Sequence, residues 1–543
     1  MCCALRQMNR DRRGILYGTG ALLASLPSCV ATAQTFIDVA AAAGIRHTQT
    51  RPDLIVDLAS SSFFTGGVAA ADFDGDGWTD LVFTRLNGTD IFYRNQGDGT
   101  FEARTKAAGF TTPTLTNGVV SADIDNDGDA DLYMTTCSGT RNYLYLNDGT
   151  GFFTDAGTGR AAALANGTFR NGQGATFGDF DRDGFLDLMT CDWGRLATNC
   201  QSRLFRNLGG SAPGFFEDVT VAAGLNIYRG SVSFRFTPRF VDLDRDGHLD
   251  LAIASDFNTS QLFWNDGDGT FTDGTIPAGV GTDFNGMGST FGDYDSDGDI
   301  DWFISNITAD PDAPPTGFGG WNRLYRNDGD RQFTDVTQEA GVRDARWGWG
   351  TSFFDFDNDG DLDLIATNGY NGAGWFDDRT VLWRNDNGVF TDISEAAGII
   401  DRLQGRGLVH LDYDNDGDLD IVIANHMDAP ILYRNDGGNA RAALRVDLVG
   451  RQSNRDGIGA FITVTPDLAS PDHQIVWEVD GGSGFLGQNE RTAHFGLGAH
   501  AGGVGRITVE WPSGVVQSQL FVGKTQTLRI YEAGWAFEIA PRP

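Results

Sequence analysis

Short apolar runs recur along most of the chain, and each comes directly after an acidic, glycine-containing stretch. Examples are Leu81–Phe83, Leu132–Met134, Leu251–Ile253, Leu364–Ala366 and Ile421–Ile423. Small and apolar residues, such as Gly67–Ala71, precede the acidic stretches. Runs of this length that are bounded by turn residues predict a β-strand on either side. We therefore expect each acidic stretch to connect two strands.

A third and a fourth strand follow in each unit. An apolar–aromatic step ends in an asparagine turn seven times, at Asn95, Asn147, Asn207, Asn265, Asn327, Asn385 and Asn435. Glycine-rich residues such as Gly97–Gly99 come next, and they are typical of a hairpin turn. The units repeat every 51 to 63 residues. Four short strands at this period predict the blades of an all-β propeller and not a helical solenoid.

The number of closing strands indicates how the ring is completed. Six units end in a strand that begins with phenylalanine, at Phe101, Phe153, Phe216, Phe271, Phe333 and Phe390. The seventh unit reaches Gly438 without such a strand, whereas Phe36–Gly44 matches Phe333–Gly341 closely. We therefore expect residues 35–39 to close the last of seven blades and to cover its exposed edge.

The pattern changes after about Ala440, where the acidic stretches stop. Alternating, strand-like runs then lie at Leu444–Leu448, Ala460–Val464, Gln474–Val479, Arg506–Trp511 and Thr527–Tyr531. The turn clusters between them predict a small antiparallel β-sandwich. The expected organisation is a signal peptide over 1–33, a seven-bladed propeller over 34–438, a C-terminal β domain over 440–533 and a tail over 534–543.

The acidic stretches share the pattern D-x-D-x-D-G-x-x-D, which occurs seven times. We name them loops 1 to 7. Four carboxylates within nine residues repel one another unless a cation lies between them, and oxygen ligands at this density suit Ca²⁺. The glycine at position 6 allows the chain to turn around an ion. Position 12 is never glutamate and a strand follows, so these loops are not EF-hands.

We expect about seven Ca²⁺ sites, each formed by the side chains at positions 1, 3, 5 and 9. The ligands would be Asp72, Asp74, Asp76 and Asp80 in loop 1, Asp123, Asp125, Asp127 and Asp131 in loop 2, Asp179, Asp181, Asp183 and Asp187 in loop 3, Asp242, Asp244, Asp246 and Asp250 in loop 4, Asp293, Asp295, Asp297 and Asp301 in loop 5, Asp355, Asp357, Asp359 and Asp363 in loop 6, and Asp412, Asp414, Asp416 and Asp420 in loop 7. The alternative is that the loops are solvated acidic turns.

Charge narrows the range of partners. The net charge is −34, and the seven loops hold 32 of the 74 acidic residues. No basic patch is present that would neutralise phosphate, so the composition argues against nucleic acid and anionic membrane surfaces as partners.

The first 33 residues predict an export signal. Arg12 and Arg13 precede the apolar run Gly14–Leu26, and a small-x-small cleavage site lies at Ala31–Ala33. This run is too short to span a bilayer. General secretion and the twin-arginine route both fit the segment, so the expected location is secreted, extracellular or periplasmic. In such an oxidising compartment, Cys191 and Cys200 are candidates for a disulfide.

Two known families resemble this chain. The acidic loops resemble the FG-GAP and VCBS repeats of propellers, and Phe177–Gly178 and Phe291–Gly292 keep the Phe-Gly pair. The segments that resemble the ASPIC/UnbV domain are Ser453–Ala460, Gly484–Gln488, His494–Gly498 and Val509–Gly514. Their combination over 35–533 is similar to the cartilage acidic protein family. The resemblance implies a secreted Ca²⁺-binding protein that serves as a binding or scaffold module, and it implies no agreed chemistry.

Three classes of function stay open. A binding or adhesion module that recognises a protein or polysaccharide is favoured over a subunit that assembles with further copies of itself, and over an enzyme or accessory protein for exported glycans. No P-loop, nucleophile elbow or dinucleotide fingerprint is present. His410 and His494 are interpreted as structural. Trp347–Gly350 and Phe234–Arg239 are candidates to line the propeller channel, with core packing the favoured interpretation.

Overall fold

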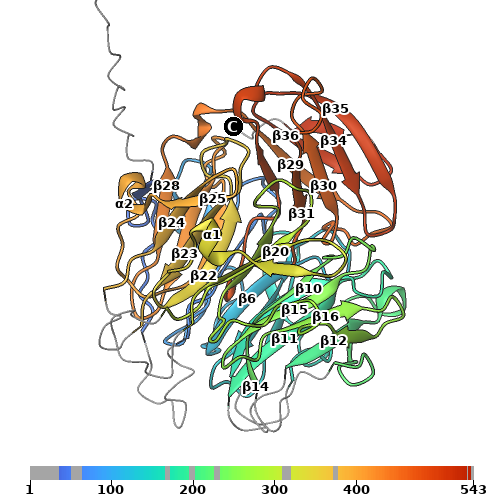
Figure 1. Ribbon diagram of the computed structural model, residues 1–543. Coiled ribbons are helices and arrows are strands. Elements are labelled where there is room, and N and C mark those ends of the chain that lie inside the picture. Colours follow the sequence, from blue (N-terminus) through green and yellow to red (C-terminus); the bar gives the residue numbers. More distant parts are fainter. Residues whose placement is uncertain are drawn as a thin grey trace, which may run out of the picture.

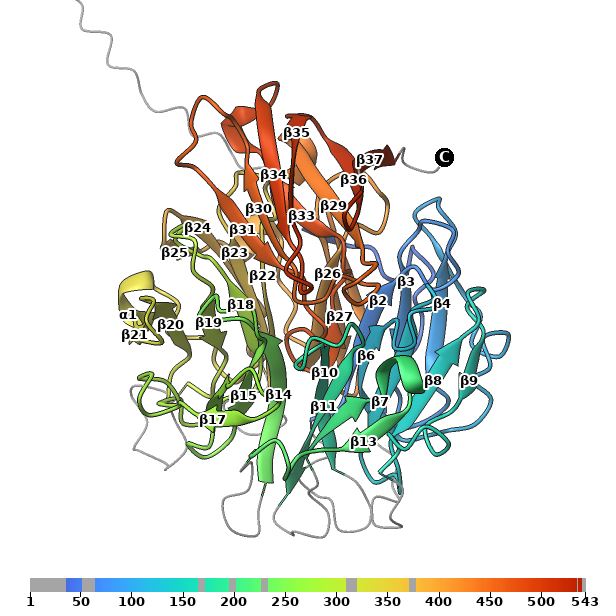
Figure 2. The ribbon, with the colours of Figure 1, turned by 90° about the vertical axis from the view of Figure 1, so that its right-hand side faces the viewer.

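The protein is an all-β propeller with a second β domain at one end (Figures 1 and 2). The computed structural model describes residues 36–50, 64–164, 171–194, 202–225, 233–308, 320–370, 377–534 and the backbone of 536–539. The segment expected to be a signal peptide, residues 1–33, lies outside the described residues. The described residues form seven antiparallel blades of four strands each, as the repeat predicts. A pairing of Trp193 and Gly194 with Phe234 and Ser233 joins blades 3 and 4 into one eight-stranded sheet.

Blades 1 to 6 each consist of four consecutive strands. Blades 1 to 3 contain β2 (Val68–Ala71), β3 (Asp80–Phe83), β4 (Ile91–Asn95) and β5 (Phe101–Ala103), then β6 (Thr116–Ala122), β7 (Asp131–Thr136), β8 (Tyr143–Asn147) and β9 (Phe153–Asp155), then β10 (Gly172–Gly178), β11 (Asp187–Gly194), β12 (Arg203–Asn207) and β13 (Phe216–Asp218). Blades 4 to 6 contain β14 (Ser233–Val241), β15 (Asp250–Ser255), β16 (Gln261–Asn265) and β17 (Phe271–Asp273), then β18 (Ser289–Gly292), β19 (Asp301–Ile304), β20 (Arg323–Asn327) and β21 (Phe333–Asp335), then β22 (Gly348–Phe354), β23 (Asp363–Asn368), β24 (Val381–Asp386) and β25 (Val389–Asp392). Two short helices, α1 (Thr337–Ala340) and α2 (Ser394–Ala397), follow the closing strands of blades 5 and 6.

Burial along the strands follows their place in a blade. The inner strands β6, β10 and β22 are buried at every position, because neighbouring blades cover both of their faces. In the closing strands β5, β9 and β13, the phenylalanine is buried while the next two residues are exposed. Outer edges of three or four residues offer little backbone for pairing with another chain.

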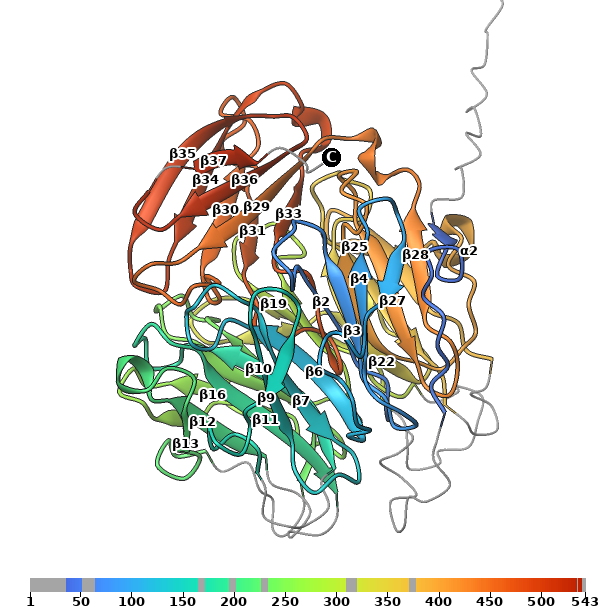
Figure 3. The same ribbon diagram turned by 180° about the vertical axis from the view of Figure 1, so that it is seen from behind.

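The last blade combines the two ends of the propeller sequence. It contains β26 (Gly405–Leu411), β27 (Asp420–Asn425), β28 (Ile431–Asn435) and, as its outermost strand, β1 (Phe36–Asp38). β1 pairs antiparallel with β28, with Phe36 opposite Asn435 (Figure 3). The Phe36 side chain is fully buried between Phe356 and Tyr433. The N-terminal strand therefore closes the ring through both backbone pairing and core packing.

The C-terminal domain is a sandwich of two four-stranded sheets. One sheet contains β33 (Ala493–Gly496), β29 (Ala443–Val449), β36 (Gln526–Tyr531) and β37 (Ala536–Ile539), and the other contains β31 (Ile475–Glu478), β30 (Phe461–Thr465), β34 (Val504–Glu510) and β35 (Val516–Val522). The expectation of a purely antiparallel sandwich is wrong at one pair, since β29 and β36 run parallel. The chain crosses to the other sheet between these two strands, and a crossover of this kind returns the chain in the same direction.

A loop of the C-terminal domain fills the propeller channel. We call residues 481–488 the plug. Its last two residues form β32 (Gly487–Gln488), which pairs in parallel with β2 of blade 1. Phe485 and Leu486 are buried in one apolar cluster with Phe236 and Trp349. The two segments that were candidates to line the channel therefore pack against the plug, in agreement with the core-packing interpretation.

Backbone hydrogen bonds fix the plug to several inner strands. The Phe177 N–H donates to the Gly481 carbonyl over 2.8 Å, and the Ser289 N–H donates to the Gly484 carbonyl over 3.3 Å. Gly484 has φ +58°, and a Cβ atom there would lie 2.7 Å from the Thr351 carbonyl oxygen. Glycine at this position thus allows the plug to turn within the narrow channel.

Candidate metal sites

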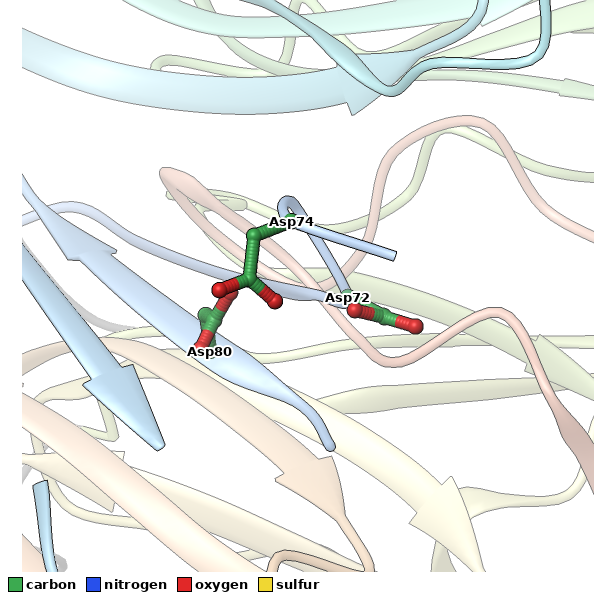
Figure 4. Close-up of side chains that lie close together, drawn as sticks. All are labelled: Asp72, Asp74 and Asp80. Carbon is green, nitrogen blue, oxygen red and sulfur yellow. The ribbon is translucent and has the colours of Figure 1, made fainter. Parts of the chain in front are cut away.

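The acidic loops bring their carboxylates together as the spacing predicts. Figure 4 shows Asp72, Asp74 and Asp80 of loop 1, whose side chains point toward one another. Groups of three carboxylates with ligand atoms within 4.8 Å of one another are formed by Asp72, Asp74 and Asp80, by Asp123, Asp125 and Asp127, by Asp179, Asp181 and Asp187, by Asp242, Asp244 and Asp246, and by Asp293, Asp295 and Asp297, and the described residues hold two more such groups. Each named group contains three of the four predicted ligands of its loop.

The first aspartate of each loop organises the turn. In loop 1, Asp72 accepts the Asp76 N–H through Oδ1 over 3.0 Å and the Gly77 N–H through Oδ2 over 2.7 Å. The same two bonds occur in the other six loops. Gly77, at position 6, has φ +88°, as the sharp turn predicted there requires. These two hydrogen bonds fix the orientation of the carboxylate at position 1 without the need for a bound ion.

Position 4 is a second left-handed residue that the sequence pattern did not indicate. Its φ is positive in all seven loops, at Gly75, Asn126, Arg182, Arg245, Ser296, Asn358 and Asn415. Asparagine at three of these positions is consistent with its tolerance of this backbone region. Each loop therefore contains two left-handed residues, at positions 4 and 6.

The ninth residue begins the second strand of the blade and is buried. Asp80 accepts the Phe73 N–H over 3.2 Å and the Asn95 N–H over 2.7 Å. Burial raises the pKa of Asp80 to about 8, and the charges of Asp74 and Asp72 add to this rise. A divalent cation close to these three carboxylates would oppose both effects and favour their ionised forms.

The third residue carries the clearest sign of a missing positive partner. In five loops its Oδ1 atom is buried without a hydrogen-bond partner, at Asp74, Asp125, Asp181, Asp295 and Asp414. A buried carboxylate oxygen without a partner is costly. The same atom in the same place in five repeats fits a cation ligand, because an ion would supply the absent interaction.

Arginines neutralise part of the charge of some loops from the rim. Arg94 contacts Asp74 and Asp76 of loop 1, and Arg160 lies 3.2 Å from Asp125 of loop 2. In loop 6, Arg441 Nη1 lies 2.9 Å from Asp357 Oδ1. Each arginine contacts only some of the carboxylate oxygens in its loop. The ion pairs therefore compensate the negative charge of the acidic loops only in part.

The asparagine of each blade joins its loop to the loop of the preceding blade. Asn147 Nδ2 donates to the Ala130 carbonyl of its own loop over 3.1 Å and to the Phe73 carbonyl of loop 1 over 2.8 Å. The corresponding pairs of bonds are made by Asn95, Asn207, Asn265, Asn327, Asn385 and Asn435. The sequence pattern identified these asparagines as turn residues, but their bonds complete a ring that links all seven loops.

The remaining candidate residues have structural surroundings. His410 is buried and lies 2.9 Å from Ser352 Oγ, and burial lowers its pKa to about 4. His494 Nε2 lies 2.6 Å from Asn358 Oδ1. Cys191 is fully buried, and its candidate partner Cys200 lies outside the described residues, so the disulfide stays a prediction. Within the described part of the chain, no helix is long and apolar enough to cross a membrane.

Two family models match parts of the chain. A model described as FG-GAP-like repeat matches residues 72–134, 242–304 and 313–366, and a model described as ASPIC and UnbV matches residues 450–535. The FG-GAP-like matches contain loops 1, 2, 4, 5 and 6, and the second match contains the plug.

Sequence relatives and solved structures with similarity to this chain were also found. Cartilage acidic protein 1 of Homo sapiens is 28% identical over 320 residues, which are 56% of this chain and 44% of the human protein, and that of Xenopus tropicalis is 25% identical over 83% of this chain and 70% of its own length. This chain thus spans less than half the length of the human relative. Solved structures include an Agrocybe aegerita lectin that recognises non-reducing terminal N-acetylglucosamine (18% identity, TM-score 0.37, 67% of this chain and 85% of that one) and BBS1N in complex with ARL6DN (10% identity, TM-score 0.40, 72% and 97%). Likenesses at these TM-scores carry no conclusion about function. The chain is therefore a propeller protein with FG-GAP-like repeats and a C-terminal ASPIC and UnbV domain, and it is similar to the cartilage acidic proteins.

Proposed function

We propose that this protein is an exported Ca²⁺-binding module that binds a protein or polysaccharide outside the cytoplasm. The single observation that carries the Ca²⁺ assignment is the buried, unpartnered Oδ1 atom at position 3, repeated in five loops. The groups of ligand atoms that lie close together in the loops are carboxylate oxygens. Such a donor set favours Ca²⁺ over Zn²⁺, which prefers nitrogen and sulfur, and over Mg²⁺, which requires stricter geometry.

The location outside the cytoplasm is supported by the N-terminal segment and by the name of the relatives. Residues 1–33 have the charge and hydropathy pattern of an export signal, and the relatives are named cartilage acidic proteins. Ca²⁺ loops with millimolar dissociation constants are typical of extracellular modules. A binding or scaffold role for a rigid, ion-stabilised propeller is consistent with each of these points.

The filled channel restricts where a partner binds. Phe485 and Leu486 are buried inside the ring, so the inner end of the channel beside them is not available to a ligand. The partner surface must therefore lie on the outside of the propeller or on the C-terminal domain.

The Ca²⁺ assignment is tested by ion content and by chelation. Elemental analysis of the mature chain, residues 34–543, should give about seven Ca²⁺ ions per chain. Chelation should lower the melting temperature, because an ion that binds only the native state adds stability through mass action. Restoring Ca²⁺ should recover that loss, and Mg²⁺ should recover it incompletely. Two or fewer ions in saturating Ca²⁺ would show that most loops are acidic turns.

One observation favours a second function, in which copies of the chain assemble. β35 is an edge strand of seven residues without a charged side chain, and Val516, Leu520 and Val522 are each more than half exposed. Natural edge strands are normally protected by charge, proline or short length. Light scattering coupled to size exclusion should then show large species that depend on concentration, and Leu520→Lys should abolish them. If the protein stays monomeric at all concentrations, assembly of copies is refuted and only the partner-binding role remains.

A further inference from the structure

The C-terminal domain lies on the end of the propeller that carries the acidic loops (Figure 2). Side chains at position 4 make the contact in five loops. Asn126 accepts the Arg455 N–H, Arg182 donates to the Pro512 carbonyl, Arg245 donates to Glu510, Asn358 bonds His494, and Asn415 accepts from Arg445, all over 2.6 to 3.0 Å. Loops 1 and 5 carry Gly75 and Ser296 there, the two smallest residues of the set. Loops with asparagine or arginine at position 4 bond the C-terminal domain through that side chain, whereas the two loops with glycine or serine there do not.

In loops 2 and 7, the backbone N–H of the first residue also donates to a carboxylate of the C-terminal domain. Asp456 accepts the N–H of Asp123, the first residue of loop 2, over 2.7 Å. Glu490 accepts the N–H of Asp412, the first residue of loop 7, over 3.0 Å. The backbone at the start of both loops is therefore positioned by an acid from outside the propeller.

Arginines of the C-terminal domain hold these two acids. Arg491 Nη2 lies 3.1 Å from Asp456, and Arg445 Nη2 lies 2.5 Å from Glu490. Arg445 also approaches the Asp412 carboxylate within 3.1 Å. Each arginine thus joins a domain carboxylate to the propeller, directly in loop 7 and through the Ser121 carbonyl near loop 2.

This interface places acids against acids. The Asp456 carboxylate lies against the first aspartate of loop 2, and the Glu490 carboxylate lies against the first aspartate of loop 7. Like charges brought together in a buried interface repel strongly, and the two arginines balance them in part. A divalent ion in loop 2 or 7 would remove most of the remaining repulsion and so favour the docked domain.

The plug belongs to the same domain and depends on the same docking. Asp480, directly before the plug, pairs with Arg239 of β14 over 2.5 Å. Glu490 follows the plug by two residues. The plug is therefore anchored at both ends by charged contacts with the propeller, and the second anchor is the acid that contacts loop 7.

We propose that ion binding in loops 2 and 7 holds the C-terminal domain on the propeller and keeps residues 481–488 in the channel, whereas loop 5 fills independently of the domain. The proposal rests on the proposed function, because it requires the loops to bind Ca²⁺. Coupling between two binding events is reciprocal. Docking of the domain must therefore raise the Ca²⁺ affinity of loops 2 and 7 by the same factor by which Ca²⁺ favours docking.

The test compares one substitution in two loops of the full mature chain. Asp127→Asn in loop 2 and Asp297→Asn in loop 5 change the same position 5, and each should remove one Ca²⁺ ion. Hydrogen exchange measured by mass spectrometry in saturating Ca²⁺ should rise at least fivefold across residues 481–488 in Asp127→Asn and stay unchanged in Asp297→Asn. Equal exchange in the two variants would overturn the proposal.

A second pair of variants tests the domain side. Asp456→Asn keeps the size of the side chain that accepts the Asp123 N–H, whereas Asp447→Asn changes an acid that pairs with Arg529 within the domain. Calorimetric titration should show one Ca²⁺ site weakened about fivefold or more in Asp456→Asn, the lower end of usual coupling, and none in Asp447→Asn. Unchanged affinities in both would overturn the proposal even if Asp127→Asn fails to fold.

The two hypotheses fail in different ways. If the wild-type chain binds two or fewer Ca²⁺ ions, the proposed function and this inference fall together. If it binds about seven ions while exchange at residues 481–488 is the same with and without Ca²⁺, only this inference fails.

Discussion

Replacing Phe485 by alanine should destabilise the whole propeller. The ring of Phe485 is fully buried and its centroid lies 5.3 Å from that of Trp349 and 5.7 Å from that of Phe236. Removal of a buried phenylalanine side chain costs about 3–5 kcal/mol, because apolar contact is lost and a cavity remains. Residues of the inner strands line that cavity and cannot move inward without breaking their sheets.

The expected shift in melting temperature follows from the size of the chain. At roughly 2 cal/mol/K of unfolding entropy per residue, the cooperative unfolding of about 500 residues has an entropy near 1 kcal/mol/K. A loss of about 3–5 kcal/mol then lowers the melting temperature by about 3–5 °C. Differential scanning calorimetry in saturating Ca²⁺ measures this shift. Phe152→Ala is the matched control, because this phenylalanine is 43% exposed, and its shift should stay below about 1 °C. Equal shifts for the two variants would refute the assignment of Phe485 as the centre of the channel core.

Three further predictions concern the ring and its surroundings. Asn147→Ala should lower the free energy of unfolding by about 2–4 kcal/mol, since it leaves the Phe73 and Ala130 carbonyls unpaired. Calorimetry of this variant beside Gln96→Ala, which changes an exposed residue, checks the prediction. A chain that begins after Gly44 should lose the strand that pairs with β28 and associate, as measured by light scattering, and a monomer with unchanged melting would contradict the closure. Burial lowers the pKa of His47 to about 4, so the unfolded chain takes up the proton first and stability falls as pH drops from about 6.5 toward 4. His47→Gln should remove this part of the pH dependence. An equal fall in the melting temperatures of the two proteins from pH 7 to 4 would argue against the prediction.

The parts of the fold that the sequence predicts are those encoded locally. Alternation of acidic loops and apolar runs indicates the strands, because a loop with Asp72 at its start must turn and Leu81 directly after it must be buried. The glycine at position 6 is recognisable for the same reason. The partnership of Phe36 with the last blade follows from repetition, since its segment matches Phe333–Gly341.

The parts that escaped the sequence depend on contacts between distant segments. Asn147 has the same neighbours in sequence as any turn asparagine, and its bond to the Phe73 carbonyl exists only after blades stack. The plug has no periodicity, since glycines surround Phe485 and Leu486. Position 4 varies from glycine to arginine because its partner belongs to another domain. Recurrence of asparagine in seven units was the available signal for the first of these features, whereas variation at position 4 could not be told from variation at positions 2, 7 and 8 of the loops.

Closure of the last blade by β1 determines when this protein can fold during its synthesis. β1 and β28 are separated by about 400 residues, which take roughly 20–80 seconds to synthesise at about 5–20 residues per second. Throughout that interval the growing chain has no complete ring, and the channel stays open until Phe485 has emerged. The earliest blades must therefore wait with exposed edges for the latest ones. A protein with this arrangement closes its ring only after the last blade has been made, and the N-terminal strand needs chaperone protection for the longest time.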